Sequence, residues 1–167
     1  MAQWAVTIPA ERYEEERLYQ RDLLTLPAFP AAGPGDEVLV LADEGLVALG
    51  RVLRADPLQI AYGRRFFDAP RPVPVLAADG PVTRLSPEQY SSVRDSLGPA
   101  PDLREWLVSV DLPIEAATPA EAVRLFWTYV AELGPRELPA FVWPRGDELA
   151  MQAYVLGGET TFDPEED

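Results

Sequence analysis

The side chains that could carry out chemistry in this chain are limited to carboxylates, Arg, Tyr, Ser and Thr. The 167 residues include no Cys, His, Lys or Asn, so all 14 basic residues are Arg, against 28 acidic ones. These absences remove disulfides, thiolate nucleophiles, imidazole bases, Schiff-base lysines and zinc–thiolate sites. Most reaction classes are thereby excluded. We expect a binding protein that is not an enzyme, with no cofactor, no metal site and no catalytic residue to name.

Carboxylates alone leave two further kinds of chemistry open. Two facing carboxylates can hydrolyse a glycosidic bond by acid–base catalysis, and oxygen ligands alone can bind Mg²⁺ or Ca²⁺. Among 28 carboxylates no spacing singles out a pair, and no EF-hand-type loop is present. A carboxylate-dependent hydrolase therefore stays as an alternative without named residues.

A run of arginines interleaved with aromatic residues, between positions 51 and 71, is the best candidate for a polar binding face. Guanidinium groups pair with phosphates and aromatic rings stack on bases, so the mixture suits a nucleotide or single-stranded RNA. The same arginines could instead neutralise Asp56 and Asp68 on a solvated strand. Two aromatic residues near the N-terminus could line a pocket or belong to the core. The candidate ligand-binding residues are Arg51, Arg54, Tyr62, Arg64, Arg65, Phe66, Trp4 and Tyr13, with Arg71 and Phe67 beside them.

Charge is distributed unevenly along the chain, whose net charge is −14. Residues 1–98 carry 14 acidic and 10 basic side chains, a net of −4, whereas residues 99–167 carry 14 acidic and 4 basic, a net of −10. The second part should repel a phosphate backbone but could engage a basic protein surface, with Trp106 or Trp143 as contacts. An acidic protein-interaction module is thus the second functional interpretation.

The composition also bears on location and assembly. No apolar run approaches the roughly 20 residues that span a bilayer, and the start Met1-Ala2-Gln3-Trp4 lacks the basic and hydrophobic regions of a signal peptide. With 47% hydrophobic and 25% charged residues the chain has globular composition. We expect a cytoplasmic protein without a membrane partner. The oligomeric state stays open, and a dimer is compatible with the apolar content.

The candidate residues must be positioned by elements in the first 98 residues. Alternation at Trp4, Val6 and Ile8 predicts a strand, and residues 10–24 are predicted as a helix. The segment Ser86-Pro87-Glu88-Gln89 has the capping-box pattern of a helix start. Further strands are predicted at 37–41, 46–53 and 59–67, with at most an edge strand at 70–76.

Residues 1–97 resemble the PUA-like superfamily, in particular EVE and ASCH domains. Members often have a Gly-Asp step into a buried strand, here Gly35-Asp36-Glu37-Val38-Leu39-Val40-Leu41. A strand with a GxGxV-type ending follows, here Ala48-Leu49-Gly50-Arg51-Val52. The helix start Leu85-Ser86-Pro87-Glu88-Gln89-Tyr90 and the opening strand Trp4-Ala5-Val6-Thr7 are also similar. The resemblance implies a compact β-barrel with flanking helices, and the binding of RNA or modified bases.

A second part follows Gly98-Pro99-Ala100-Pro101-Asp102, which is either a hinge between domains or a loop inside one. Residues 103–110 could form a strand or a helix. A helix is predicted over 119–133, with an apolar face that should pack on a sheet. Its partner is a predicted hairpin at 140–156, with strands at 140–143 and 148–156; the second strand would place Leu149, Met151, Ala153 and Val155 on one side.

The sequence therefore predicts an α+β fold. Residues 1–98 form a PUA-like β-barrel module with flanking helices, and residues 99–167 form an acidic α+β extension in which a helix packs on a β-hairpin. The predicted function is non-enzymatic binding of RNA or a nucleotide. The alternatives are an acidic module that engages a basic protein, and a carboxylate-dependent hydrolase.

Overall fold

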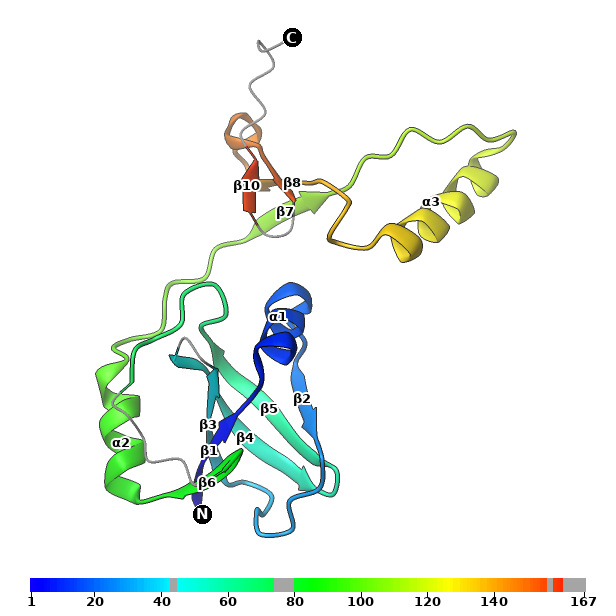
Figure 1. Cartoon of the computed structure of the whole chain (residues 1–167). Helices are drawn as coiled ribbons and strands as arrows, with labels where there is room; N and C mark the ends of the chain where they lie inside the picture. Colours follow the sequence, from blue (N-terminus) through cyan, green and yellow to red (C-terminus); the bar gives the residue numbers. More distant parts are fainter. Residues whose placement is uncertain (43–44, 74–79, 156–157, 161–167) are drawn as a thin grey trace. The chain divides into compact units, whose positions relative to one another are not determined.

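The computed structural model describes residues 1–42, 45–73, 80–155 and 158–160, and it confirms the α+β class (Figure 1). Two compact units are present, Met1–Pro101 (unit 1) and Asp102–Asp167 (unit 2). The division between them falls inside the Pro-rich segment 98–102. None of the helices in the described ranges is long and apolar enough to cross a membrane.

Unit 1 is built on one mixed sheet. Its strands are β1 (Gln3–Thr7), β2 (Leu23–Leu26), β3 (Glu37–Ala42), β4 (Gly45–Ala55), β5 (Leu58–Arg65) and β6 (Val82–Leu85). Their order across the sheet is β2-β5-β4-β3-β1-β6. Strands β1 and β3 run parallel, and the other neighbours run antiparallel. Since β2 and β6 are edges, the described strands form an open sheet, where the PUA-like resemblance implies a barrel.

Helix α1 (Ala10–Tyr19) ends before the predicted limit at residue 24. Gln20 adopts a left-handed conformation with φ of 47°, and its N–H donates to the carbonyl of Glu16, which stops the helix. The chain then pairs with β5 as strand β2, where Leu24 is fully buried. The predicted helix over 10–24 is therefore wrong at residues 20–24, because pairing with a distant strand competes with local helix propensity.

Helix α2 (Pro87–Ser96) begins where the capping box predicts. The Ser86 hydroxyl accepts a hydrogen bond from the N–H of Gln89, and the Gln89 side chain accepts one from the N–H of Ser86. The region predicted as at most an edge strand, 70–76, lies partly outside the described residues. In its described part, Arg71 forms an isolated bridge with Leu46.

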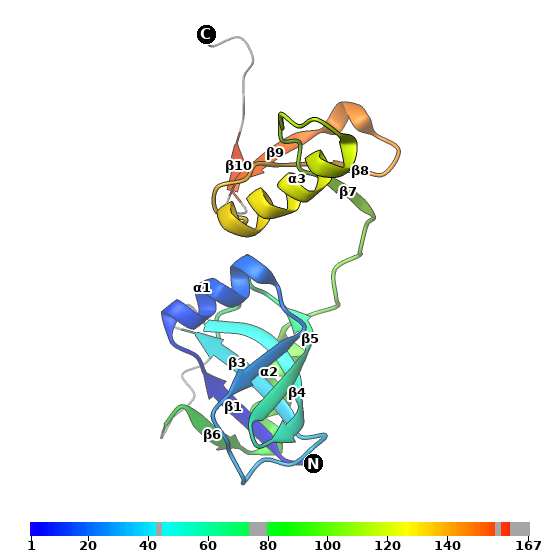
Figure 2. The ribbon, with the colours of Figure 1, turned by 90° about the vertical axis from the view of Figure 1, so that its right-hand side faces the viewer.

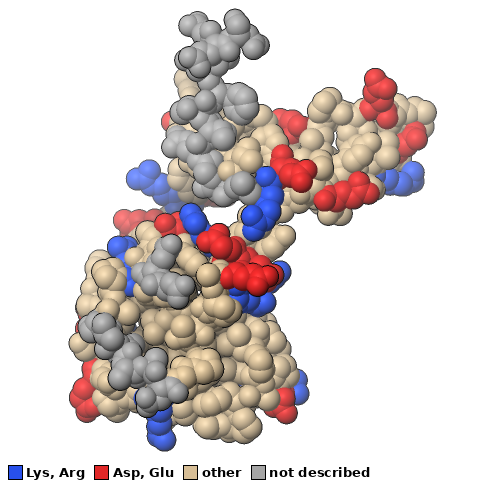
Figure 3. All heavy atoms as spheres, viewed as in Figure 1, with Lys and Arg blue, Asp and Glu red and all other residues tan. Residues whose placement is uncertain are grey.

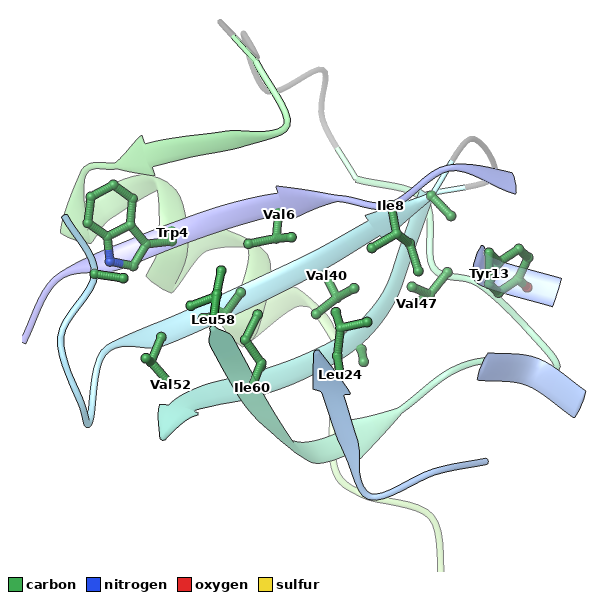
Figure 4. Close-up of a cluster of buried hydrophobic side chains, with 14 of the residues drawn as sticks. Trp4, Val6, Ile8, Tyr13, Leu24, Val40, Val47, Val52, Leu58 and Ile60 are labelled. Atoms are coloured by element: carbon green, nitrogen blue, oxygen red, sulfur yellow. The ribbon is translucent and has the colours of Figure 1, made fainter. Parts of the chain in front are cut away.

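Both faces of the unit 1 sheet are covered by apolar layers, because successive side chains on a strand point to opposite faces. On the α1 side, Tyr13 of α1 packs in a buried cluster with side chains such as Val6, Val40 and Ile60 (Figure 4). On the α2 side, Tyr90 of α2 packs with a second cluster that includes Leu39. The two helices thus hold opposite faces of one sheet.

A buried carboxylate joins the start of the chain to the turn before β3. Asp36 is 8% exposed and accepts hydrogen bonds from the N–H of Ala2 (2.7 Å), the N–H of Gly33 (2.9 Å) and Nε1–H of Trp4 (2.9 Å). Burial by itself pushes the pKa of Asp36 upward. The three hydrogen bonds and the N-terminal charge outweigh burial, so the pKa of Asp36 lies below its ordinary value.

This network makes the stability of unit 1 dependent on acid. Because folding lowers the pKa of Asp36, the unfolded chain binds its proton more readily than the folded one. The contribution of Asp36 is therefore complete above the unfolded pKa and is lost as the pH falls through the folded pKa. Urea unfolding of the wild type and of Asp36→Ala between about pH 7 and pH 2 should show converging free energies on acidification. A difference that stays constant over this range contradicts the prediction.

Unit 2 contains a four-stranded antiparallel sheet of order β10-β9-β8-β7 and one long helix. Its elements are β7 (Trp106–Ser109), α3 (Pro119–Leu133), β8 (Ala140–Pro144), a 3₁₀ helix (Glu148–Ala150), β9 (Gln152–Val155) and β10 (Gly158–Thr160). The segment 103–110, left open between strand and helix, thus contains strand β7. Helix α3 has the predicted bounds, and the Thr118 hydroxyl accepts the N–H of Glu121 at its start.

Two expectations for unit 2 are wrong. The predicted strand 148–156 begins only at Gln152, because the N–H of Ala150 bonds to the carbonyl of Asp147 and a 3₁₀ turn forms; Leu149 is fully exposed. Leu156 lies outside the described residues. The helix was expected to pack on the hairpin, yet no residue of α3 is buried. Helix α3 overlaps the strands of unit 2 in Figure 2 but is drawn apart from them in Figure 1.

Candidate functional site

A cavity of about 320 Å³ lies on the α2 side of the unit 1 sheet. Strands β3, β4 and β5 and helix α2 supply its lining, which consists of Glu37, Leu49, Gly50, Arg51, Ala61, Tyr62, Gly63, Arg64 and Tyr90. Small-molecule sites commonly have about 300–1,000 Å³ and a largely apolar lining with a few converging polar groups. The cavity has both properties, at the small end of that range.

A β-bulge at Gly63 determines which arginine faces the cavity. Leu49 pairs with Arg64 while Gly50 pairs with Tyr62, so Gly63 is the extra residue on β5. A bulge shifts the alternation of side chains by one position. Arg64 therefore lies on the α2 side of the sheet, although regular alternation from Tyr62 would place it on the α1 side.

The next residue, Arg65, is directed elsewhere. Its guanidinium lies 5.5 Å from the ring centre of Tyr62, donates to the carboxylate of Asp22 at 2.7 Å, and also donates to the carbonyl of Arg21 at 3.0 Å. Arg65 thus binds the segment between α1 and β2. Two arginines that are adjacent in sequence serve different sides of the molecule.

Arg64 holds the end of α2 beside the cavity. Its terminal nitrogens donate to the carbonyls of Gly98 (2.9 Å), Pro99 (2.7 Å) and Leu97 (3.4 Å). The same guanidinium lies 4.9 Å from the ring centre of Phe66. Because these donors are occupied, Arg64 mainly lines the cavity and holds the end of α2.

Arg51 is the cation that remains available to a ligand. It is exposed, lines the cavity, and forms no hydrogen bond or ion pair with any residue that the structure describes. Its cross-strand partner on β3 is Glu37. One oxygen of Glu37 accepts a hydrogen bond from Nε2 of Gln3 at 3.2 Å. A guanidinium donor and a carboxylate with one engaged oxygen therefore lie side by side at the edge of the cavity.

Tyr90 supplies a hydroxyl group that remains protonated at neutral pH. Burial, followed by the negative charge of Glu37, raises the pKa of Tyr90, against the smaller influence of Arg94 and Arg51. Tyr62 lines the cavity from β5, but its side chain packs on the α1-side cluster and its hydroxyl is buried near Glu16 of α1. Burial, followed by the charge of Glu16, raises the pKa of Tyr62. The Tyr90 hydroxyl is not prepared to act as a nucleophile, so Tyr90 can offer a hydrogen bond and ring surface to a ligand in the cavity.

The remaining predicted site residues lie away from this cavity. Arg54 is exposed on β4 outside the lining, and Phe66 is buried beneath Arg64 and Arg71. Trp4 and Tyr13 are core residues, 5% and 4% exposed. Trp4 donates to Asp36 and the hydroxyl of Tyr13 donates to the carbonyl of Phe67 at 2.7 Å.

The structure brings together Arg51, Tyr62 and Arg64, and it adds two residues that the sequence did not indicate. In the sequence, Glu37 is part of a predicted strand and Tyr90 is part of a predicted helix start. Their roles depend on β3 lying next to β4 and on α2 covering that face. No pattern in the sequence identifies Glu37 and Tyr90 as site residues unless the order of the strands is known.

Charge around unit 1 is mixed. On the face visible in Figure 3, Arg side chains alternate with Asp and Glu. A continuous basic track of the kind that follows a nucleic-acid backbone is not seen on that face. Within the described ranges, no group of three or more acidic side chains is arranged to hold a metal ion.

Comparisons of the chain with protein-family models, curated proteins and solved structures found no match.

Proposed function

We propose that unit 1 is a non-enzymatic module that binds a single nucleotide or nucleobase, free or at an unpaired position of RNA, in the cavity beside α2. The adjacent pair Arg51 and Glu37, in a small and largely apolar cavity next to Tyr90, carries this proposal. The resemblance of residues 1–97 to EVE and ASCH domains supports the same ligand class. We also propose, on that resemblance, that unit 1 is related to the PUA-like superfamily.

The chemistry of the lining matches the edge of a base. Bases present hydrogen-bond donors and acceptors side by side; arginine donates to their ring nitrogens and carbonyl oxygens, and a carboxylate accepts from an exocyclic amine. Arg51 and Glu37 supply this combination, and an aromatic ring such as Tyr90 offers a surface for stacking. The mixed charge around unit 1 favours a small ligand over a long nucleic acid.

The cavity gives little support to the hydrolase alternative. Hydrolysis by carboxylates requires two of them, one on each side of the scissile bond. The described lining contributes Glu37 and no second carboxylate, and the raised pKa of Tyr90 leaves no general base there besides Glu37. Binding is therefore the activity that this geometry supports best.

Substitution of Arg51 by Gln should weaken ligand binding about tenfold to a hundredfold, because it removes the bidentate donor. The measurement is calorimetric titration with the common nucleoside monophosphates and nucleobases, and with short single-stranded RNAs, at low salt. Arg54→Gln is the matched control, since it removes the same charge from the same strand outside the cavity. Equal losses in the two variants, or no binding by the wild type, would refute the proposal.

A second candidate function is the binding of a basic protein by unit 2. Residues 102–167 carry the same 14 acidic and 4 basic side chains that give the second part its net charge of −10. Figure 3 shows Asp and Glu side chains over the part of unit 2 that contains α3. Such binding should weaken steeply with added salt, whereas nucleobase binding in the unit 1 cavity should be far less sensitive.

A further inference from the structure

Unit 2 buries very little apolar surface of its own. Among its described apolar residues, Leu138 alone falls in the buried class. Its large exposed apolar side chains include Trp106, Leu107 and Val108 on β7, and Val123, Trp127, Tyr129 and Leu133 on α3. Exposed apolar surface this extensive marks an interaction site in a soluble protein.

Strand β7 is the part of this surface with the clearest requirement for a partner. It lies at the end of the sheet order and pairs only with β8 among the described strands. Trp106, Leu107 and Val108 are 50%, 41% and 65% exposed. Because neighbouring residues point to opposite faces, apolar side chains are exposed on both faces of an edge with unpaired backbone groups. Such an edge pairs readily with another strand.

The charges along β7 favour a second copy of this chain over a basic protein. Between Glu105 and Asp111 the edge has no charged residue, so a basic partner finds no carboxylate along the strand itself. An uncharged apolar strand with acidic residues only beyond its ends is compatible with its own copy. Most soluble homo-oligomers are twofold dimers, in which the same surface of each subunit meets.

Only some registers are available to two antiparallel copies of β7. A twofold axis normal to the sheet keeps each face on its own side, so directly opposed residues must belong to the same face. Centred on Val108, such pairing would place Asp111 opposite Glu105, and a second carboxylate would face one that already has Arg145 as its partner. Centred on Leu107, it places Glu105 opposite Ser109.

We propose that unit 2 dimerises by antiparallel pairing of β7 with β7 of a second copy, with Leu107 on the twofold axis. In this register Trp106 lies opposite Val108 of the second copy, twice. Pairs of an aromatic and a β-branched residue stabilise neighbouring strands. The two four-stranded sheets become one continuous sheet, and the β7 edge of each copy is paired.

The absence of native cysteine permits a direct test in the full-length chain. Directly opposed residues in antiparallel strands have Cα atoms about 4.5–5.5 Å apart, within the range of a disulfide. Leu107→Cys should therefore form a covalent dimer rapidly under mild oxidation, as seen by non-reducing electrophoresis. Leu53→Cys, 50% exposed on β4 of unit 1, is the control and should stay largely monomeric. Cross-linking of Leu107→Cys no faster than this control overturns the proposed pairing.

Light scattering coupled to size-exclusion chromatography provides a second measurement. The wild type should have twice the 18.4 kDa mass of one chain. Val108→Arg should have the monomer mass, whereas Leu53→Arg should remain dimeric; both wild-type side chains are at least half exposed, so neither change disrupts a core. A wild type that stays monomeric at about 100 µM, or a monomer that captures a basic protein through β7, refutes self-pairing. Nucleotide binding by unit 1 is measured separately and can fail independently.

Discussion

Replacement of Asp36 by alanine is expected to lower the free energy of unfolding of unit 1 by about 3–5 kcal/mol. The change leaves three donors without their acceptor: the N–H groups of Ala2 and Gly33 and the indole N–H of Trp4. The Asp36–Trp4 hydrogen bond is buried, so water does not readily replace the lost carboxylate. Urea unfolding followed by circular dichroism measures the loss.

Asp68→Ala is the matched control for this prediction. The Asp68 side chain is 81% exposed, and its nearest cationic partner, Arg17, lies 3.7 Å away. An exposed ion pair of this kind contributes little, so the change should stay within about 0.5 kcal/mol. If Asp36→Ala costs no more than Asp68→Ala, the Asp36 network does not stabilise the fold as argued.

A methyl group at position 50 is expected to lower the free energy of unfolding by about 1–3 kcal/mol, because the site is already full. A Cβ built on Gly50 lies 2.5 Å from Cγ2 of Ile60 and 2.9 Å from the carbonyl oxygen of Ala61. Ile60 is fully buried, and the second contact is backbone, so neither can easily move aside. Gly50→Ala should therefore separate β4 from β5 locally and lower the urea midpoint.

Gly63→Ala is the corresponding control, because it lines the same cavity from the neighbouring strand. Its nearest contact for a new Cβ is the carbonyl oxygen of Leu49 at 3.7 Å, which is an ordinary distance. We expect its stability to lie within about 0.5 kcal/mol of the wild type. Similar losses at both glycines would show that the crowding beneath Gly50 is not the cause.

Local features of the fold could be predicted because their causes are local. The capping residues of α2 and α3 bond to groups three residues away, so Ser86 and Thr118 reveal the helix starts directly. Short apolar segments between turns indicate β3, β4 and β5 in the same way. Two elements differ from the local prediction. Strand β2 depends on β5, and the 3₁₀ turn at Leu149 interrupts a segment with strand-like alternation.

Only some of the residues of the candidate site could be predicted from the sequence. Arg51, Tyr62 and Arg64 were predicted as binding residues, and the structure places them around one cavity. Glu37 and Tyr90 complete it only because β3 pairs with β4 and α2 packs over that face. The bulge at Gly63 then separates the neighbouring arginines, which no spacing in the sequence shows.

The sequence by itself determined which kinds of side-chain chemistry are absent from this protein. A chain without Cys, His or Lys offers no thiolate, imidazole or side-chain amine in any fold, because composition does not change on folding. Tertiary structure decided where the remaining groups lie. It places Arg51 beside Glu37 in unit 1, and it leaves the edge strand β7 uncovered in unit 2. Both arrangements depend on strand pairing and register between distant segments, which a sequence pattern over a few residues does not specify.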